Sequence, residues 1–318
     1  MRVVVIGGSG FIGTNVAIQL KRDGHEVVVL DRIPAADRVF EQNQIAFAEG
    51  DYISGKNIRE TVQEGDCVIH LVSTSQPNQS NRNILKDAED NLLPSLRLFD
   101  ICVERKAAKL IYASSGGQVY GIPVYTPIDE QHPTDPQSAY GIHKLAVEKY
   151  LQLYARLYGL GVQILRISNP YGPGQQPFRG QGVIATFIAS AYLKQEVEIW
   201  GSGKAVRDYI YIDDLAAAFG RAVAYQGAEQ VFNIGSGAGT SVLDILTCVE
   251  QVTGIMIPKR YMDAKSSDVN TNILNCKKAA QELSWQPVVG LKEGIRRMTD
   301  HWSPDTSRFI VGQNNEVG

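Results

Sequence analysis

Cysteine is scarce in this chain of 318 residues. The four present are Cys67, Cys102, Cys248 and Cys276, and their spacings are wide and irregular, with no C-x-x-C pair. Disulfide frameworks and zinc sites depend on more numerous or more closely spaced cysteines. We therefore expect no disulfide framework and no metal site, and the composition favours a reducing cytoplasm as the location.

The chain also lacks a large excess of charge of one sign and long apolar runs. The formal net charge is -3, which provides no basic surface for nucleic acid and no polybasic segment for anionic lipids. The first apolar run, residues 3–6, ends at glycine and is too short for a signal-peptide core or a membrane span. We expect no nucleic-acid partner and no membrane partner, so a few individual cations would bind any anionic ligand.

The chain has instead a series of short apolar runs without polar alternation. Such runs suit strands that are buried on both faces of a parallel sheet, and helical patterns alternate with them. This order predicts an α/β fold, a doubly wound parallel sheet with a smaller carboxyl-terminal lobe. The expected strands are residues 3–6, 27–30, 67–72, 110–113 and 162–167, and the expected helices are residues 11–22, 91–105 and 140–158.

Four glycines follow the first expected strand. Gly7 precedes the pattern Gly8-x-Gly10-x-x-Gly13, which opens the expected helix of residues 11–22. In a Rossmann unit one glycine makes the tight turn, one lets the pyrophosphate approach the backbone, and one lets the helix pack on its strand. Because the pattern lies between a strand and a helix, it predicts a dinucleotide-binding site.

Asp31 ends the second apolar run, where the dinucleotide pattern expects an acidic residue. Its carboxylate would accept hydrogen bonds from both adenosine ribose hydroxyls and would repel a 2′-phosphate. NAD is therefore favoured over NADP, although the positive charge of Arg32 argues in the opposite direction. Asp51, which precedes Tyr52, is a candidate for the adenine amino group, with a simple turn as the alternative.

Tyr140 and Lys144 lie one helical turn apart and share a helix face. A neighbouring ammonium lowers the pKa of a phenol from its usual value near 10, which makes the tyrosine a usable general acid or base. The lysine could also bind the nicotinamide ribose. His143 lies between them in the sequence, and we expect it to point off their shared face as a structural residue.

Ser114 and Ser115 follow the expected strand of residues 110–113. Residues at the carboxyl end of a parallel strand lie at the ligand crevice, so a serine there could hydrogen-bond the reacting oxygen. After Asn169 the sequence becomes turn-rich. We predict an NAD-binding domain of residues 1–168, to which residues 206–234 return, and a substrate-binding lobe of residues 169–318.

These motifs resemble those of the extended short-chain dehydrogenase/reductases, in the NAD-dependent epimerase/dehydratase family. The resemblance runs from Met1 to about Gly290 and is greatest to the UDP-glucose 4-epimerases. The segments that carry it, in family order, are GGSGFIG, Asp31, SSGGQVYG, Tyr140 with Lys144, RISNPYGPG, VRDYIYIDD and ELSWQP.

The resemblance implies roles for further residues. Catalysis would involve Tyr140, Lys144 and Ser115, and the guanidinium of Arg207 would bind the diphosphate. The implied NAD-binding residues are Gly7, Gly10, Phe11, Ile12, Gly13, Asp31, Arg32, Asp51, Tyr52, Leu71, Asn91, Ser114, Tyr140 and Lys144. The implied substrate-binding residues are Ser115, Tyr140, Asn169, Gln181, Trp200, Arg207, Lys265 and Asp268.

Some positions depart from the family pattern. The usual serine or threonine three residues before Val119 is Gly116, so Ser115 is expected to replace it. The next two positions, Gly117 and Gln118, lack the acidic pair with which sugar 4,6-dehydratases eliminate water. Dehydration is therefore not expected.

Two further departures concern the substrate. Lys265 stands near where a second phosphate-binding arginine is often found, and lysine is a point charge without the guanidinium fork. Asn272 lies where a bulkier residue can exclude N-acetyl groups. The sequence therefore does not exclude an N-acetylhexosamine as the sugar of the substrate.

The resemblance thus implies that the protein is an isomerase. It also implies a homodimer that is formed through the helices of residues 91–105 and 140–158. The protein would be an NAD-dependent 4-epimerase of a UDP-hexose or UDP-N-acetylhexosamine that works through a transient 4-keto sugar. The alternatives are a nucleotide-sugar reductase or decarboxylase of the same fold, or a non-catalytic NAD-binding protein.

Overall fold

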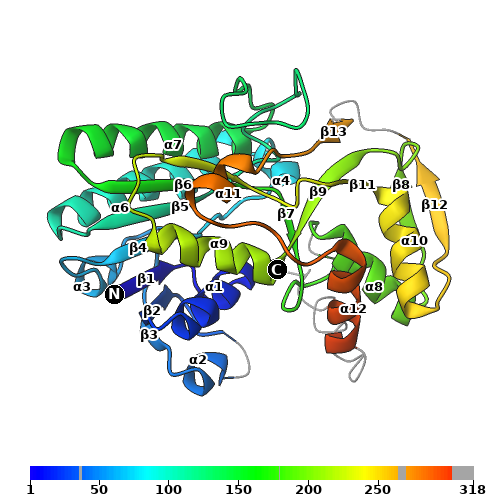
Figure 1. Ribbon diagram of the computed structural model, residues 1–318, viewed down its shortest axis with the longest axis horizontal. Helices are drawn as coiled ribbons and strands as arrows, with labels where there is room; N and C mark the ends of the chain where they lie inside the picture. Colours follow the sequence, from blue (N-terminus) through cyan, green and yellow to red (C-terminus); the bar gives the residue numbers. More distant parts are fainter. Residues whose placement is uncertain (36–37, 179, 264–269, 303–318) are drawn as a thin grey trace.

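A seven-stranded sheet, with every neighbouring pair parallel, forms the centre of the computed structural model (Figure 1). The structure describes residues 1–35, 38–178, 180–263 and 270–302. In spatial order the strands are β10 (Val231–Ile234), β6 (Gly161–Ile167), β5 (Lys109–Ser115), β4 (Cys67–His70), β1 (Arg2–Ile6), β2 (Glu26–Asp31) and β3 (Ala46–Glu49).

Both faces of this sheet are buried, as the continuous apolar runs predict. Val3 and Val5 point into a core cluster that includes residues of α1 (Phe11–Arg22) and α9 (Ile212–Ala224). Val4 and Ile6 point into a second cluster on the other face. That face is covered by α6 (Leu93–Glu104) and α7 (Ala139–Tyr158) (Figure 1). The predicted doubly wound α/β fold is confirmed.

The rest of the chain forms two smaller sheets. In the first, β9 (Val206–Tyr211) pairs with β7 (Asn169–Tyr171), β11 (Gly239–Ser241) and β13 (Thr271–Asn272). In the second, β8 (Val197–Trp200) pairs with β12 (Lys259–Met262). The helices α8 (Val183–Leu193), α10 (Val242–Thr253) and α12 (Leu291–Trp302) accompany them (Figure 1).

The chain returns to the large sheet after entering this lobe. Strand β10 pairs with β6, and α9 packs against α1, whereas β9 lies in a smaller sheet. The division into an NAD-binding domain with a returning segment and a substrate-binding lobe stays a prediction.

The shorter elements connect the layers. The helix expected over residues 91–105 begins within a π-helix, η2, and continues as α6, in which Pro94 is near the start. Within the described part of the chain, no helix has the length and apolar character of a membrane span. The remaining helices are α2 (Val39–Gln42), α3 (Ile58–Thr61), α4 (Pro77–Ser80), α5 (Ile84–Asp87), η2 (Ala88–Leu92) and α11 (Lys277–Glu282).

Candidate active site

The glycine loop between β1 and α1 has the shape that the sequence pattern predicts. Gly7 has a φ of +81°, which favours glycine. A Cβ on Gly13 would lie 2.5 Å from Gly7 O, so only glycine lets α1 approach the loop. Gly10 is the N-cap residue of α1 and has no side chain to cover the start of the helix. A Cβ at this position would meet only Gly7 O, at 3.7 Å. The loop therefore leaves open the approach that a pyrophosphate needs.

Asp31 lies at the end of β2, facing this loop. Its carboxylate accepts hydrogen bonds from the backbone N–H of Ser9 at 3.0 Å and of Arg32 at 2.8 Å. A cavity of about 230 Å³ opens beside it. Residues that line the cavity are Gly7, Gly10, Leu30, Asp31, Arg32, Gly50, Asp51, Tyr52, Ile53, Leu71, Val72, Ser73 and Thr74. An open glycine loop with an acid at the next strand end fits the phosphates and ribose of NAD.

The other predicted cofactor residues differ in how free their side chains are. Asp51 lines the cavity, and its carboxylate also closes a turn by accepting from the backbone N–H of Ile53 at 3.1 Å. The hydroxyl of Tyr52 is used inside the protein, 2.7 Å from Ser95 Oγ. The buried amide of Asn91 accepts from the backbone N–H of Thr74 at 2.9 Å. Phe11 and Ile12 begin α1, where they are partly buried.

Helix α7 carries Tyr140 and Lys144, and side chains from two parts of the chain fix its start. Ser138 accepts a hydrogen bond from Gly141 N at 3.1 Å. Asn81 and Ser80 accept from Ala139 N at 2.8 Å and Tyr140 N at 3.1 Å. These bonds satisfy the first three backbone donors of the helix, which have no partner within it. The first turn, which holds Tyr140, is thereby fixed.

The side chain of Tyr140 is partly buried, and its hydroxyl lies close to the hydroxyls of Ser115 and Ser73. Burial raises the pKa of Tyr140 to about 12, although these two neighbouring hydroxyls oppose the rise. The lowered pKa that we expected from Lys144 is therefore not seen in the protein alone. Ser73 also lines the cavity, so the cavity extends from Asp31 to a neighbour of the tyrosine.

Lys144 is buried, with its ammonium 5.6 Å from the centroid of the Tyr140 ring. It donates to the backbone carbonyl of Ala113 at 2.9 Å. Burial lowers the pKa of Lys144 to about 8, and the carboxylates of Glu148 and Asp87 partly oppose the shift. A lysine held in this way keeps a positive charge close to the tyrosine near neutral pH.

The two serines at the end of β5 point to different partners. Ser114 is buried and donates to the carboxylate of Glu148, which also pairs with Arg166 at 2.6 Å. Ser115 contacts Tyr140 instead. Gly116 lies under the side chain of Leu274, which occupies the space that a side chain at this position would need. That Ser115 takes the role that the family pattern gives to residue 116 stays a prediction.

Apart from Ser115 and Tyr140, the described residues predicted to bind substrate lie in the second lobe and its approaches. The amide of Asn169, in β7, donates to Asp208 O at 2.8 Å, and Arg207 of β9 donates to Val206 O at 2.9 Å. Trp200, at the end of β8, is 41% exposed, and Gln181 is exposed just before α8. Lys265 and Asp268 lie outside the described residues.

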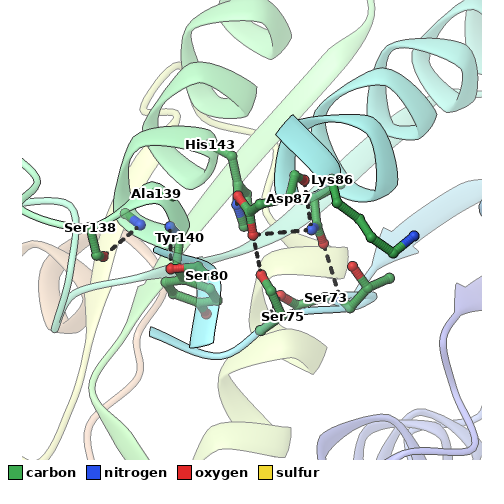
Figure 2. A network of polar contacts seen from close by, with 12 residues as sticks. Ser73, Ser75, Ser80, Lys86, Asp87, Ser138, Ala139, Tyr140 and His143 are labelled. Carbon is green, nitrogen blue, oxygen red and sulfur yellow. Dashed lines mark hydrogen bonds and ion pairs between the residues drawn. The ribbon is translucent and has the colours of Figure 1, made fainter. Parts of the chain in front are cut away.

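Two residues beside Tyr140 were missed by the sequence analysis. His143 does not turn away, because its ring packs edge-on against Tyr140 with centroids 5.2 Å apart, as helix residues three apart can do. Its Nδ1 is 2.6 Å from the carboxylate of Asp87, at the end of α5 (Figure 2). The spacing of three residues between Tyr140 and His143 was a sequence signal for the contact of their rings. No sequence signal connects Asp87 to them.

Comparison with known proteins places this geometry in a family. Residues 3–235 match the model of the NAD dependent epimerase/dehydratase family. The chain belongs to this family. The predicted recognition is therefore confirmed, and so is NAD as the cofactor, in agreement with the open glycine loop and with Asp31.

Individual relatives are similar over nearly the whole chain. A putative UDP-glucose 4-epimerase of Methanocaldococcus jannaschii is 33% identical over 96% of this chain and 99% of its own length. A dTDP-4-dehydro-6-deoxyglucose reductase of Escherichia coli is 34% identical over 93% of this chain and 96% of its own. The crystal structure of UDP-glucose 4-epimerase from Thermotoga maritima with UDP-glucose is 33% identical, covers 96% of this chain and 99% of that chain, and has a TM-score of 0.89. The predicted class, a nucleotide-sugar 4-epimerase, agrees with the names of the Methanocaldococcus jannaschii and Thermotoga maritima proteins.

Proposed function

We propose that this protein is an NAD-dependent isomerase that epimerises C4 of a UDP-hexose or UDP-N-acetylhexosamine. One observation carries the proposal. The cavity beside Asp31 is lined by Ser73, whose hydroxyl lies close to that of Tyr140, and Ser115 lies close to the same hydroxyl. A dinucleotide site and a tyrosine–serine pair therefore meet where an alcohol could be oxidised.

In this mechanism the protein moves one proton and holds the reacting oxygen. Bound NAD supplies a hydride acceptor and donor and, when oxidised, a positive charge that favours the phenolate. Tyr140 accepts the proton of the sugar 4-hydroxyl and later returns it, while the hydroxyl of Ser115 hydrogen-bonds the same oxygen. The ammonium of Lys144, 5.6 Å from the centroid of the Tyr140 ring, also stabilises the phenolate.

The nucleotide part of the substrate would be bound from the second lobe. Arg207 offers a guanidinium to the diphosphate, and Trp200 offers an exposed ring to the base. Asn169 and Gln181 would contact the sugar nucleotide. Lys265 and Asp268, outside the described residues, stay predictions for the same role.

The proposal is tested by proton NMR of the purified protein with NAD and UDP-glucose, and then with UDP-N-acetylglucosamine. We expect the C1 proton signal of the galacto epimer to appear without net formation of NADH. Tyr140→Phe is the matched variant, which should fold and bind NAD but lose most turnover. Turnover of neither sugar, or near-normal activity of Tyr140→Phe, would contradict the proposal.

A reductase is the second candidate, and the similarity to the Escherichia coli reductase favours it. It would use the same Tyr140 to protonate a keto-sugar oxygen, but it would consume external NADH in proportion to product. Absorbance at the NADH band, followed with a dTDP-4-keto-6-deoxyhexose, separates the two activities.

We also propose that the protein is a homodimer formed through α6 and α7. Large apolar side chains stay exposed on these helices and on the neighbouring α5, namely Ile84, Leu85, Leu93, Ile142, Leu157 and Tyr158. Apolar surface of this kind marks interaction sites. Light scattering should give the mass of two chains, and Leu157→Asp should shift the mass toward one chain.

The cytoplasm is the location that we propose for this protein. All four cysteines are free thiols in the structure, which agrees with a reducing compartment. Cell fractionation with a tagged chain would test the location.

A further inference from the structure

Asp87 is a buried carboxylate near Tyr140 that the proposed mechanism does not use. It is 6% exposed, and Oδ2 lies 2.6 Å from Nδ1 of His143. The other oxygen accepts a hydrogen bond from the hydroxyl of Ser75, so that Asp87 lies between the two residues (Figure 2). An ionised carboxylate only accepts hydrogen bonds, so His143 donates through Nδ1–H. Burial, followed by the charge of Lys144, lowers the pKa of His143 and keeps its ring neutral at neutral pH.

The contacts of this pair return to Tyr140 by two routes. On one side, the ring of His143 packs edge-on against the Tyr140 ring. On the other, Ser75 O accepts a hydrogen bond at 3.1 Å from the hydroxyl of Ser73, which lies close to that of Tyr140. Tyr140, His143, Asp87, Ser75 and Ser73 thus form a closed set of contacts, which we term the Asp87 circuit.

The Asp87 circuit is anchored from outside by Asn91. Its side-chain N–H donates to Asp87 O at 2.9 Å, and its Oδ1 accepts from the backbone N–H of Thr74. Residue 74 lies between the two serines of the circuit. The short turn of residues 73–75 is therefore held by Asn91 through its backbone and by Asp87 through Ser75.

We propose that Asp87 and His143 are positioning residues for the proton transfer, which hold the hydroxyl of Ser73 against the hydroxyl of Tyr140. The aligned tyrosine would then have two serine partners, Ser73 and Ser115. The kinetic part of this inference rests on the proposed function. The alignment of the Tyr140 hydroxyl can be measured without turnover.

The experiment compares three variants with a matched control. His143→Leu removes the donor to Asp87, Ser75→Ala removes the link to the turn, and His143→Asn keeps a donor near the place of Nδ1. The control is His132→Leu, because His132 is also buried and hydrogen-bonded, with Nε2 accepting from Val124 N at 2.9 Å, but lies outside the circuit.

We expect His143→Leu and Ser75→Ala to lower kcat about tenfold, with KM for the UDP-sugar changed less than about twofold. His143→Asn should recover most of the loss. His132→Leu should lower Tm but keep kcat. Wild-type kcat in His143→Leu, or no recovery in His143→Asn, would overturn the proposal.

A second readout uses the protein without substrate. Tyrosine ¹³Cζ NMR spectra, with the Tyr140 signal assigned by Tyr140→Phe, report the environment of the phenol oxygen. The Tyr140 signal should move in His143→Leu and Ser75→Ala and stay in place in His132→Leu. An unmoved signal overturns the Asp87 circuit. If it moves as expected while the wild type turns over no nucleotide sugar, the proposed function fails and the alignment stands.

Discussion

Ser115 and Gly116 are neighbours in the chain with opposite surroundings. The hydroxyl of Ser115 reaches Tyr140, whereas a Cβ on Gly116 would lie 2.6 Å from Leu274 Cδ1 and 3.2 Å from Arg166 O. The sequence analysis predicted that Ser115 replaces the usual serine or threonine at position 116, and this role stays a prediction. The sequence could not give the reason, because Leu274 is far away in the chain.

Gly116→Ser should therefore fail to improve the site. We expect the free energy of unfolding to fall by about 1–3 kcal/mol, because the added side chain overlaps Leu274. Urea unfolding measures this loss. The control is Gly117→Ser, because a Cβ on Gly117 meets only Ser115 Oγ, at 3.9 Å. A fully stable Gly116→Ser, or equal losses in both variants, would contradict the prediction.

Burial of Lys144 should appear as a pH dependence of stability. Its pKa is lowered from 10.5 to about 8, so between these values the unfolded chain holds a proton that the folded chain has lost. The free energy of unfolding should therefore rise with pH across this window, by at most about 1.4 kcal/mol per pH unit. Urea unfolding of the wild type and Lys144→Met should differ by an amount that changes with pH. A constant difference would show that the pKa is not lowered.

At the scale of the elements, α7 shows what a local pattern can predict. Its length followed from the apolar spacing and from Gly159, which caps its end in the left-handed region with a φ of 71°. The caps that Ser80 and Asn81 provide were not predictable, because they come from α4 and the residue after it, far from α7 in the sequence. The same holds for Asp87.

Removal of these caps should loosen the first turn of α7. Ser80→Ala and Asn81→Ala should each lower the free energy of unfolding by about 1 kcal/mol, because a backbone donor loses its partner. Both should also lower kcat, since Tyr140 lies in that turn. Ser241→Ala is the control, because Ser241 caps α10, away from Tyr140, by accepting from Asp244 N at 3.1 Å. Equal effects on kcat in all three variants would exclude a specific role of the α7 caps.

At the scale of the whole molecule, the large sheet was easier to predict than the second lobe. Strands buried on both faces have continuous apolar sequences, and the glycine pattern and Asp31 fix where the cofactor site lies along them. The smaller sheets depend on strands as short as β13, which has two residues and pairs with β9 across a long stretch of chain. Pairings of that kind leave little periodic signal.

The late return of α9 and β10 to the large sheet has a consequence for synthesis on the ribosome. Until residue 234 has emerged, β6 presents an unpaired edge and α1 lacks the helix that covers it. Nascent chains of intermediate length therefore expose surfaces on which chaperones act. A chain truncated after residue 168 should aggregate or bind a hydrophobic dye, whereas one extended to residue 235 should do so less, as sedimentation and dye fluorescence would show. The first domain to be translated would thus be among the last to become stable.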